Sequence, residues 1–287
     1  MDLKIILKDL RPSLSASSIV TYSSILRNIH QKVFGKDTSI DIKNFDKFTS
    51  ILDELEDLPS NRRKTILSAL VVLTDNKKYR EAMLDDIKNY NTEIAKQKKT
   101  TTQKENWLEP EFLESKIALY KRNADLLYKK KKLNSNDLQE IQNYIILVLF
   151  GGEYIVPRRS KDYTDFRLTN IDKEKDNYLE KNELVFNSYK TFKAYGTQRI
   201  KIPLKMRNIL HKWIKVNPTA YLLFDKNLEP LTAVKLNQRL NKIFDGKKIS
   251  VNALRHTFLT EKYGTIGEDM EDMGSSINMA TTYIKKD

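Results

Sequence analysis

The segment from 250 to 285 brings together residue types that are used in phosphoryl transfer. Arg255 and His256 lie in an apolar run with helical spacing, and Ser275 and Tyr283 follow them. A tyrosine attacks a phosphodiester only if its hydroxyl loses a proton and the charge developing on the phosphate is neutralised. A guanidinium such as that of Arg255 supplies this neutralisation. Taken singly, Arg255 is better interpreted as a surface arginine and Tyr283 as a core aromatic, so only their combination indicates this chemistry.

The same segment resembles a known family. The run LRHTF from Leu254 to Phe258, the Met-Gly step that ends at Gly274 and the tyrosine at Tyr283 are similar to the C-terminal signature of the tyrosine recombinases. These are DNA integrases that work through a phosphotyrosine. In its amino-acid sequence, the stretch PRRSKDY from 157 to 163 most resembles integrases of large DNA viruses and their mobile elements. The Met-Gly step that ends at Gly274, together with Met279, shows the same resemblance.

The family places its first catalytic arginine just after a buried helix, three residues before an acidic residue. In this chain an apolar helix-like segment is followed by a Pro-Arg-Arg run that begins at Pro157. Counting back from Asp162 selects Arg159, whereas aligning on Pro157 selects Arg158. The resemblance therefore implies Arg159 as the first catalytic arginine, with Arg158 as the reserve assignment, and Arg255 as the second.

The family's catalytic lysine lies on a β-hairpin, ahead of a strand that ends in proline. Lys190, followed by the stretch from 196 to 203, fits this pattern, and Lys193 is the reserve assignment. The resemblance implies that this lysine donates the proton needed by the departing 5′ oxygen, which is general-acid catalysis. Without the family pattern, both residues are ordinary solvated lysines of a hairpin.

Two positions depart from the family pattern. Asn252 stands where a histidine usually precedes the second arginine by three residues, and Ser275 stands where histidine or tryptophan often follows the glycine. Both side chains can hydrogen-bond a non-bridging phosphate oxygen, but neither titrates near neutral pH as histidine does. We therefore expect a slower reaction, or a larger contribution of the lysine to catalysis. His256, a common residue after this arginine in the family, is expected to pack or to orient the site.

The resemblance implies a complete reaction. Tyr283 attacks the scissile phosphate of double-stranded DNA, giving a 3′-phosphotyrosyl link and a free 5′ hydroxyl, and a 5′ hydroxyl of the partner duplex then reverses the step. Neither a metal nor a small-molecule cofactor is expected, and ATP is not needed because the protein–DNA link keeps the bond energy. The implied assembly is a homotetramer on two DNA sites.

Three alternative functions remain open at this stage. A type IB topoisomerase uses a similar arginine, lysine and tyrosine set but religates the same strand. A catalytically inactive DNA-binding relative is suggested by Asn252 and Ser275. A basic helical scaffold without DNA affinity is the third.

Composition agrees with a polyanionic partner without proving one. The 287 residues include 51 Lys and Arg against 38 Asp and Glu, which gives a formal charge of +13. Such a charge favours nucleic acid as a partner, although a solvated lysine-rich surface explains it equally well.

Several classes of site are made improbable by composition. The chain has no cysteine and only three histidines, which are scattered, so disulfides, thiol chemistry and zinc sites are not expected. The N-terminal segment is too charged for a secretory signal, and no apolar run approaches membrane-spanning length. We expect a soluble intracellular protein, in the nucleus or cytoplasm of a host wherever its DNA is, with no membrane partner.

Apolar periodicity predicts a helical N-terminal domain over residues 1–96. Four amphipathic helices are expected, and they resemble the core-binding domain that precedes the catalytic domain in the tyrosine recombinases. The stretch 97–106 loses its apolar residues and gains charge and threonine, which is typical of a linker. The four helices are indicated by apolar positions at 19–33, 45–55, 66–73 and 79–94.

A second domain is predicted over 107–287. It is expected to contain a helix from about Pro110 to Leu127, a buried helix from Leu138 to Phe150, two short strands at 182–187 and 199–202, and further helices. The predicted fold class is mainly α with a small β-hairpin or sheet, arranged as a two-domain clamp with an α+β catalytic domain.

Overall fold

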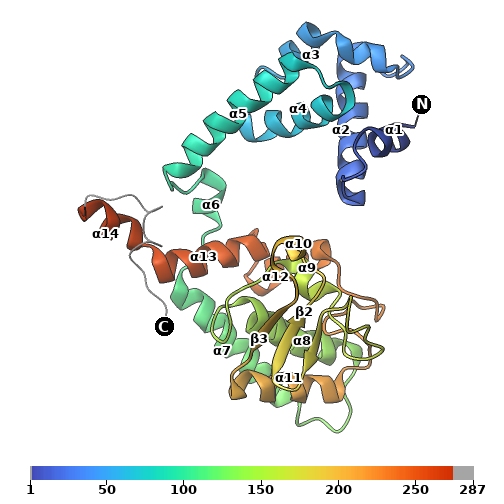
Figure 1. Cartoon of the computed structure of the whole chain (residues 1–287). Coiled ribbons are helices and arrows are strands. Elements are labelled where there is room, and N and C mark those ends of the chain that lie inside the picture. Colours follow the sequence, from blue (N-terminus) through green and yellow to red (C-terminus); the bar gives the residue numbers. More distant parts are fainter. Residues whose placement is uncertain (1, 274–287) are drawn as a thin grey trace. The chain divides into compact units, whose positions relative to one another are not determined.

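The structure is a computed structural model that describes residues 2–273 (Figure 1). The chain divides into two compact units, and the division lies between Lys99 and Thr100, inside the stretch that the sequence predicts as a linker. Each unit has its own hydrophobic core. The predicted fold class, mainly α with a small sheet, is confirmed.

The first unit is a helical bundle. Its core contains Leu26 of α2, Phe45, Leu70 of α4 and Tyr79 of α5, and the Tyr79 hydroxyl donates a hydrogen bond of 2.8 Å to the Phe45 carbonyl. The elements are α1 (Leu3–Leu10), α2 (Ala16–Phe34), a 3₁₀ helix η1 (Ile42–Asp46), α3 (Phe48–Glu54), α4 (Ser60–Thr74) and α5 (Lys77–Ala95).

Helix α1 was missed by the sequence analysis, and the predicted second helix is in fact two elements, η1 and α3. In α1, Leu3 and Leu7 are four residues apart and therefore share one face, which is fully buried. The Asp2 side chain caps the helix by accepting a hydrogen bond from the Lys4 backbone nitrogen. The segment is only eight residues long, and Ile5 and Leu10 are exposed although they are apolar, so its pattern was not recognised as a helix.

The second unit places helices around a small antiparallel sheet. Its elements are α6 (Thr101–Glu105), α7 (Pro110–Leu127), α8 (Ser135–Phe150), α9 (Ser160–Thr164), β1 (Tyr178–Glu180), β2 (Glu183–Phe186), α10 (Phe192–Tyr195), β3 (Gln198–Lys201), α11 (Leu204–Val216), α12 (Ala233–Ile243), α13 (Val251–Tyr263) and α14 (Ile266–Asp272).

Helix α6 lies within the stretch expected to be a linker. Thr100 and Gln103 form a capping box, in which the Thr100 hydroxyl accepts from the Gln103 backbone nitrogen and the Gln103 side chain accepts from that of Thr100. This reciprocal pair satisfies two donors at the helix start, which explains why a polar segment is helical here.

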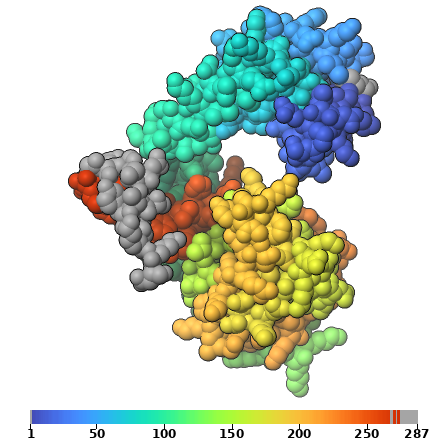
Figure 2. Space-filling model, viewed as in Figure 1, coloured from blue at the N-terminus to red at the C-terminus, as the bar shows by residue number. Residues whose placement is uncertain are grey.

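The sheet has the order β1-β2-β3, and both pairs are antiparallel. Strands β2 and β3 were predicted, whereas the three-residue β1 was not. Between β2 and β3, where a turn was expected, the chain forms the one-turn helix α10. This helix lies at an end of the sheet in Figure 1, and its residues are exposed; it belongs to the part of the second unit that Figure 2 colours yellow to orange.

Helix α8 is the buried centre of the second unit, as its sequence predicts. Every residue from Tyr144 to Phe150 is buried, and α8 packs against α7, α11 and α13. Tyr163, Phe166 and Phe186 add a cluster of aromatic rings beside Phe150. None of the helices described by the structure is both long and apolar enough to cross a membrane.

Candidate active site

Four of the residues singled out by the sequence line one open pocket of about 680 Å³ in the second unit. Arg159 comes from the residue before α9, Lys190 from the connection between β2 and β3, and Asn252 and Arg255 from α13. These three segments are well separated along the chain, so it is the fold of the second unit that brings the four side chains together.

Helix α13 positions two of them because of how it begins. The Ser250 hydroxyl caps the helix by accepting from the Ala253 backbone nitrogen at 3.2 Å, and Leu254 turns into the core. Asn252 and Arg255, three residues apart, then share an outward face. The Arg255 Nη1 donates a hydrogen bond of 3.3 Å to the Asn252 Oδ1, so the asparagine orients the guanidinium within the pocket.

The two adjacent arginines have different environments. Arg159 is half-buried and lines the pocket, and its guanidinium makes no hydrogen bond or ion pair with any residue of the described range 2–273. Arg158 is not among the pocket's lining residues; its Nε donates to the Asp162 Oδ2 at 2.8 Å. Of the two assigned arginines, Arg159 is therefore the one that lines the pocket.

The carboxylate that holds Arg158 is itself buried. Asp162 is 2% exposed, and burial raises the pKa of its carboxyl, against the lowering effect of the neighbouring Arg158 and Arg159. An ion pair in this environment is specific in geometry because the charge has few alternative partners.

Two helices direct their N-terminal ends at the pocket. Thr232, the N-cap of α12, and Ser250, the N-cap of α13, both line it, as do the first residues of each helix. The N-terminus of a helix carries partial positive charge and unpaired N–H groups, which favour anions.

The balance of charged side chains in the pocket is also positive. Arg159, Lys161, Lys190 and Arg255 line it together with one carboxylate, that of Asp165. Within the described part of the chain, the ammonium groups of Lys161 and Lys190 make no hydrogen bond or ion pair. These charges therefore remain available to an anionic ligand such as a phosphate group of DNA.

Lys161 and Asn237 were missed by the sequence analysis. Lys161 belongs to the same Arg-Arg-Ser-Lys run as Arg159, and that run is the one signal from which it could have been identified. Asn237, on α12, lines the pocket and accepts a hydrogen bond of 3.4 Å from the Val251 backbone nitrogen, which ties α12 to the start of α13.

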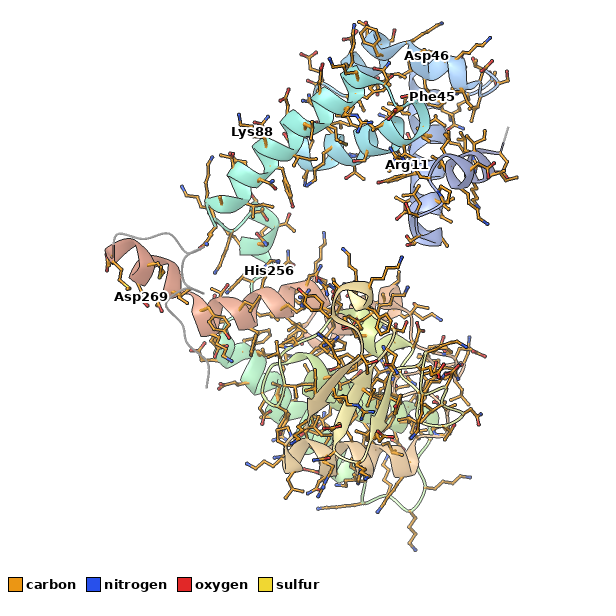
Figure 3. The ribbon with its side chains drawn as sticks, viewed as in Figure 1. Arg11, Phe45, Asp46, Lys88, His256 and Asp269 are labelled. Atoms are coloured by element: carbon orange, nitrogen blue, oxygen red, sulfur yellow. The ribbon has the colours of Figure 1, made fainter. Side chains whose placement is uncertain are left out.

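The reserve assignments from the sequence do not line this pocket. Lys193 on α10 and His256 on α13 are exposed and are not among its lining residues; His256 is labelled in Figure 3. Ser275 and Tyr283 lie outside the described residues. Within the described range, no group of three or more His, Cys, Asp or Glu side chains is arranged to hold a metal ion.

Comparison with known proteins gives distant similarities. No family model matches the chain, and no curated protein matches it. Among solved structures, it is similar to a crystal structure of XerA recombinase, with 11% identity, coverage of 99% of this chain and 92% of that chain, and a TM-score of 0.35. It is also similar to the XerH site-specific recombinase bound to its difH substrate in a pre-cleavage complex, with 13% identity, coverage of 99% and 91%, and a TM-score of 0.41.

Proposed function

We propose that this protein is a site-specific DNA recombinase of the tyrosine class, which cuts and rejoins double-stranded DNA through a 3′-phosphotyrosyl intermediate. The observation that carries the proposal is the pocket that unites Arg159, Lys190, Asn252 and Arg255. The sequence resemblance implies catalytic roles for these residues, and their presence in the lining of one open, cationic pocket supports the proposal.

In the proposed reaction, Arg159 and Arg255 bind the non-bridging oxygens of the scissile phosphate, and Asn252 orients Arg255. Tyr283 loses its hydroxyl proton to water as its oxygen attacks the phosphorus, the bond from phosphorus to the 5′ oxygen breaks, and Lys190 gives its proton to that oxygen. A 5′ hydroxyl then attacks the phosphotyrosine and returns its proton to Lys190, and the released Tyr283 oxygen regains a proton from water.

The energetic demand on the pocket is large enough to require several cations. A tyrosine with a pKa of about 10 is about one part in a thousand ionised at pH 7, which costs roughly 4 kcal/mol. Two guanidinium groups and an ammonium fixed around one phosphate offset this cost by stabilising the charge of the transition state.

The partner in this proposal is double-stranded DNA, and the working assembly is a homotetramer on two DNA sites. The formal charge of +13 supports a polyanionic partner. The resemblance in spelling to integrases of large DNA viruses and mobile elements is part of the same proposal, and it points to integration or excision of such an element.

The test uses nicked duplexes drawn from DNA that flanks the gene. In such a substrate the cleaved end diffuses away, so the covalent protein–DNA adduct accumulates and is visible on a denaturing gel. We expect an adduct with the wild type and none with Tyr283→Phe. Tyr263→Phe is the matched control because Tyr263 is an exposed tyrosine near the end of α13, and it should form the adduct normally.

The outcomes separate the proposal from its alternatives. An adduct that depends on Tyr283, together with exchange of strands between two duplexes, supports recombination. An adduct with relaxation of supercoiled plasmid but no strand exchange indicates a type IB topoisomerase. Binding without an adduct on any duplex indicates an inactive DNA-binding relative, to which Asn252 and Ser275 already direct attention.

A further inference from the structure

Arg158 occupies a position that the proposed reaction does not explain. Its side chain is 14% exposed, and both sides of its guanidinium are engaged. The Nε donates to the Asp162 Oδ2 at 2.8 Å, and the Nη1 donates to the Gln198 Oε1 at 2.7 Å. Asp162 lies on α9 and Gln198 begins β3, so one guanidinium links the helix that follows Arg159 to the hairpin strand that follows Lys190.

The same guanidinium also contacts two aromatic rings. Its central carbon lies 4.0 Å from the ring centroid of Phe186, the last residue of β2, and 5.1 Å from that of Tyr189. A guanidinium over the face of an aromatic ring is attracted to it and is the more firmly held when it is shielded from water. Arg158 therefore contacts both arms of the β2–β3 connection.

Tyr189 is the residue immediately before Lys190. Its hydroxyl donates a hydrogen bond of 2.6 Å to the Gly196 carbonyl, and this bond joins the two ends of the connection between β2 and β3. The backbone at Lys190 is thus tied on one side through Tyr189 to Arg158, whereas the Lys190 side chain itself is exposed at the pocket. A long lysine side chain meets a phosphate reproducibly only if its backbone is fixed.

We propose that Arg158 is a positioning residue for Lys190: through Asp162, Gln198 and Tyr189 it holds the segment 187–198 in place, so that the Lys190 ammonium lies in the same pocket as Arg159. The adjacent arginines then have different roles, since Arg159 faces the ligand and Arg158 fixes the segment that carries Lys190. The catalytic consequence rests on the proposed function, whereas the holding of the segment does not.

The first test measures hydrogen exchange by mass spectrometry on the full chain and needs no DNA. We expect Arg158→Met to accelerate exchange of the amides in 187–198 by about tenfold or more. Because this variant leaves the buried Asp162 charge without its partner, the double variant Arg158→Met/Asp162→Asn is measured as well. The matched control is Arg199→Met, which removes an exposed arginine of the same hairpin that pairs with Glu180 and Glu183.

The result decides the inference directly. Acceleration confined to 187–198 in both Arg158 variants, and absent in Arg199→Met, supports it. Wild-type exchange in that segment overturns it. Equal acceleration throughout the second unit overturns it too, because that pattern reports lost stability rather than lost position.

The second test asks whether Arg158 acts through Lys190. On a cleavable duplex, Arg158→Met is expected to slow adduct formation about 100-fold, the size of effect produced by a small misplacement of a catalytic group. A substrate with sulfur in place of the bridging 5′ oxygen leaves as a thiolate, which needs no proton because thiols ionise near pH 8.5. This substrate should restore the rate of Arg158→Met and of Lys190→Met, but not that of Arg159→Met.

A double variant completes the second test. If Arg158 acts through Lys190, Arg158→Met/Lys190→Met should be no slower than Lys190→Met alone. Losses that multiply, or an Arg158→Met defect that sulfur does not restore, overturn the catalytic consequence. If the wild type forms no adduct on any duplex, the proposed function fails, and the exchange measurement still decides whether Arg158 holds the segment.

Discussion

Gly152 lies directly against the ring of Phe258. A Cβ built on Gly152 would be 2.5 Å from the Phe258 Cδ2, and the glycine has a φ of +86°, a conformation that L side chains rarely adopt. Phe258 is on α13, three residues after Arg255. The bend after α8 is therefore in direct contact with the helix that carries the second pocket arginine.

This contact predicts that Gly152→Ala lowers stability and, with the proposed function, DNA cleavage as well. The strained φ and the displaced ring should cost about 1–3 kcal/mol of unfolding free energy, and a shift of α13 should move Arg255 relative to Arg159. Urea denaturation and adduct formation measure the two effects. Adding Phe258→Ala removes the clash but leaves the strain in φ. If Gly152→Ala/Phe258→Ala lost further stability and recovered no cleavage, this explanation would be contradicted.

The sequence predicted the elements whose signal is long or strongly periodic. Helix α8 was expected because its second half is apolar on all sides, and the structure confirms it as the buried centre of the second unit. Helix α1 and strand β1 were missed because eight and three residues are short segments for a periodic pattern. What stabilises these elements is burial against distant segments, which periodicity does not reveal.

The pocket shows a similar division. The family resemblance implied Arg159, Lys190, Asn252 and Arg255, and all four line one pocket. The sequence favoured Arg159 but kept Arg158 in reserve, because neighbouring residues of the same type differ only in the direction of their side chains. The direction of the Arg158 side chain is set by its ion pair with Asp162 and by the aromatic rings of Phe186 and Tyr189.

A second prediction concerns Arg63 in the first unit. Its Nε donates to the Asp86 Oδ2 at 2.8 Å, and the Asp86 side chain is 0% exposed. Arg63→Ala leaves that carboxylate buried without its partner, which typically costs about 3–5 kcal/mol. The loss is measured by urea denaturation of the full chain, in which hydrogen exchange of the amides in residues 1–99 reports the unfolding of the first unit.

The control for Arg63 is an exposed ion pair on the same unit. Lys77 and Glu81 lie 3.8 Å apart on the surface of α5, where a pair contributes less than about 1 kcal/mol. Lys77→Ala should therefore be close to the wild type. Similar losses in the two variants would show that burial of Asp86 is not what makes Arg63 important.

A third prediction concerns acid. The Lys173 ammonium and the Arg199 guanidinium donate hydrogen bonds to Glu180, and they hold the pKa of that carboxyl at about 2, below its usual 4.5. A lowered pKa in the folded state means that the stabilising effect is complete above the unfolded pKa. It is lost as pH falls from about 4.5 towards about 2.

Glu180→Gln should consequently be less stable than the wild type at pH 7, and the difference should vanish near pH 2. Urea midpoints of both proteins across this range test the prediction. Asp57→Asn is the reference, since the structure shows no hydrogen bond or ion pair from the Asp57 side chain to any residue of 2–273. A difference between wild type and Glu180→Gln that persists unchanged at pH 2 would assign the effect to packing instead of charge.

The last prediction concerns Lys161, which the sequence did not single out. Its ammonium lines the pocket beside Arg159 without an ion pair to any described residue, so a DNA phosphate that enters the pocket meets an unpaired cation there. Lys161→Met should weaken binding to duplex DNA about equally for different sequences, and it should reduce the slope of log affinity against log salt by about 1. Lys215→Met, at the exposed end of α11 and outside the pocket, is the matched control and should keep the wild-type slope. If both variants change the slope equally, the positive charge of the whole chain accounts for DNA affinity and Lys161 has no particular role; if only Lys161→Met changes it, the pocket is where the phosphate binds.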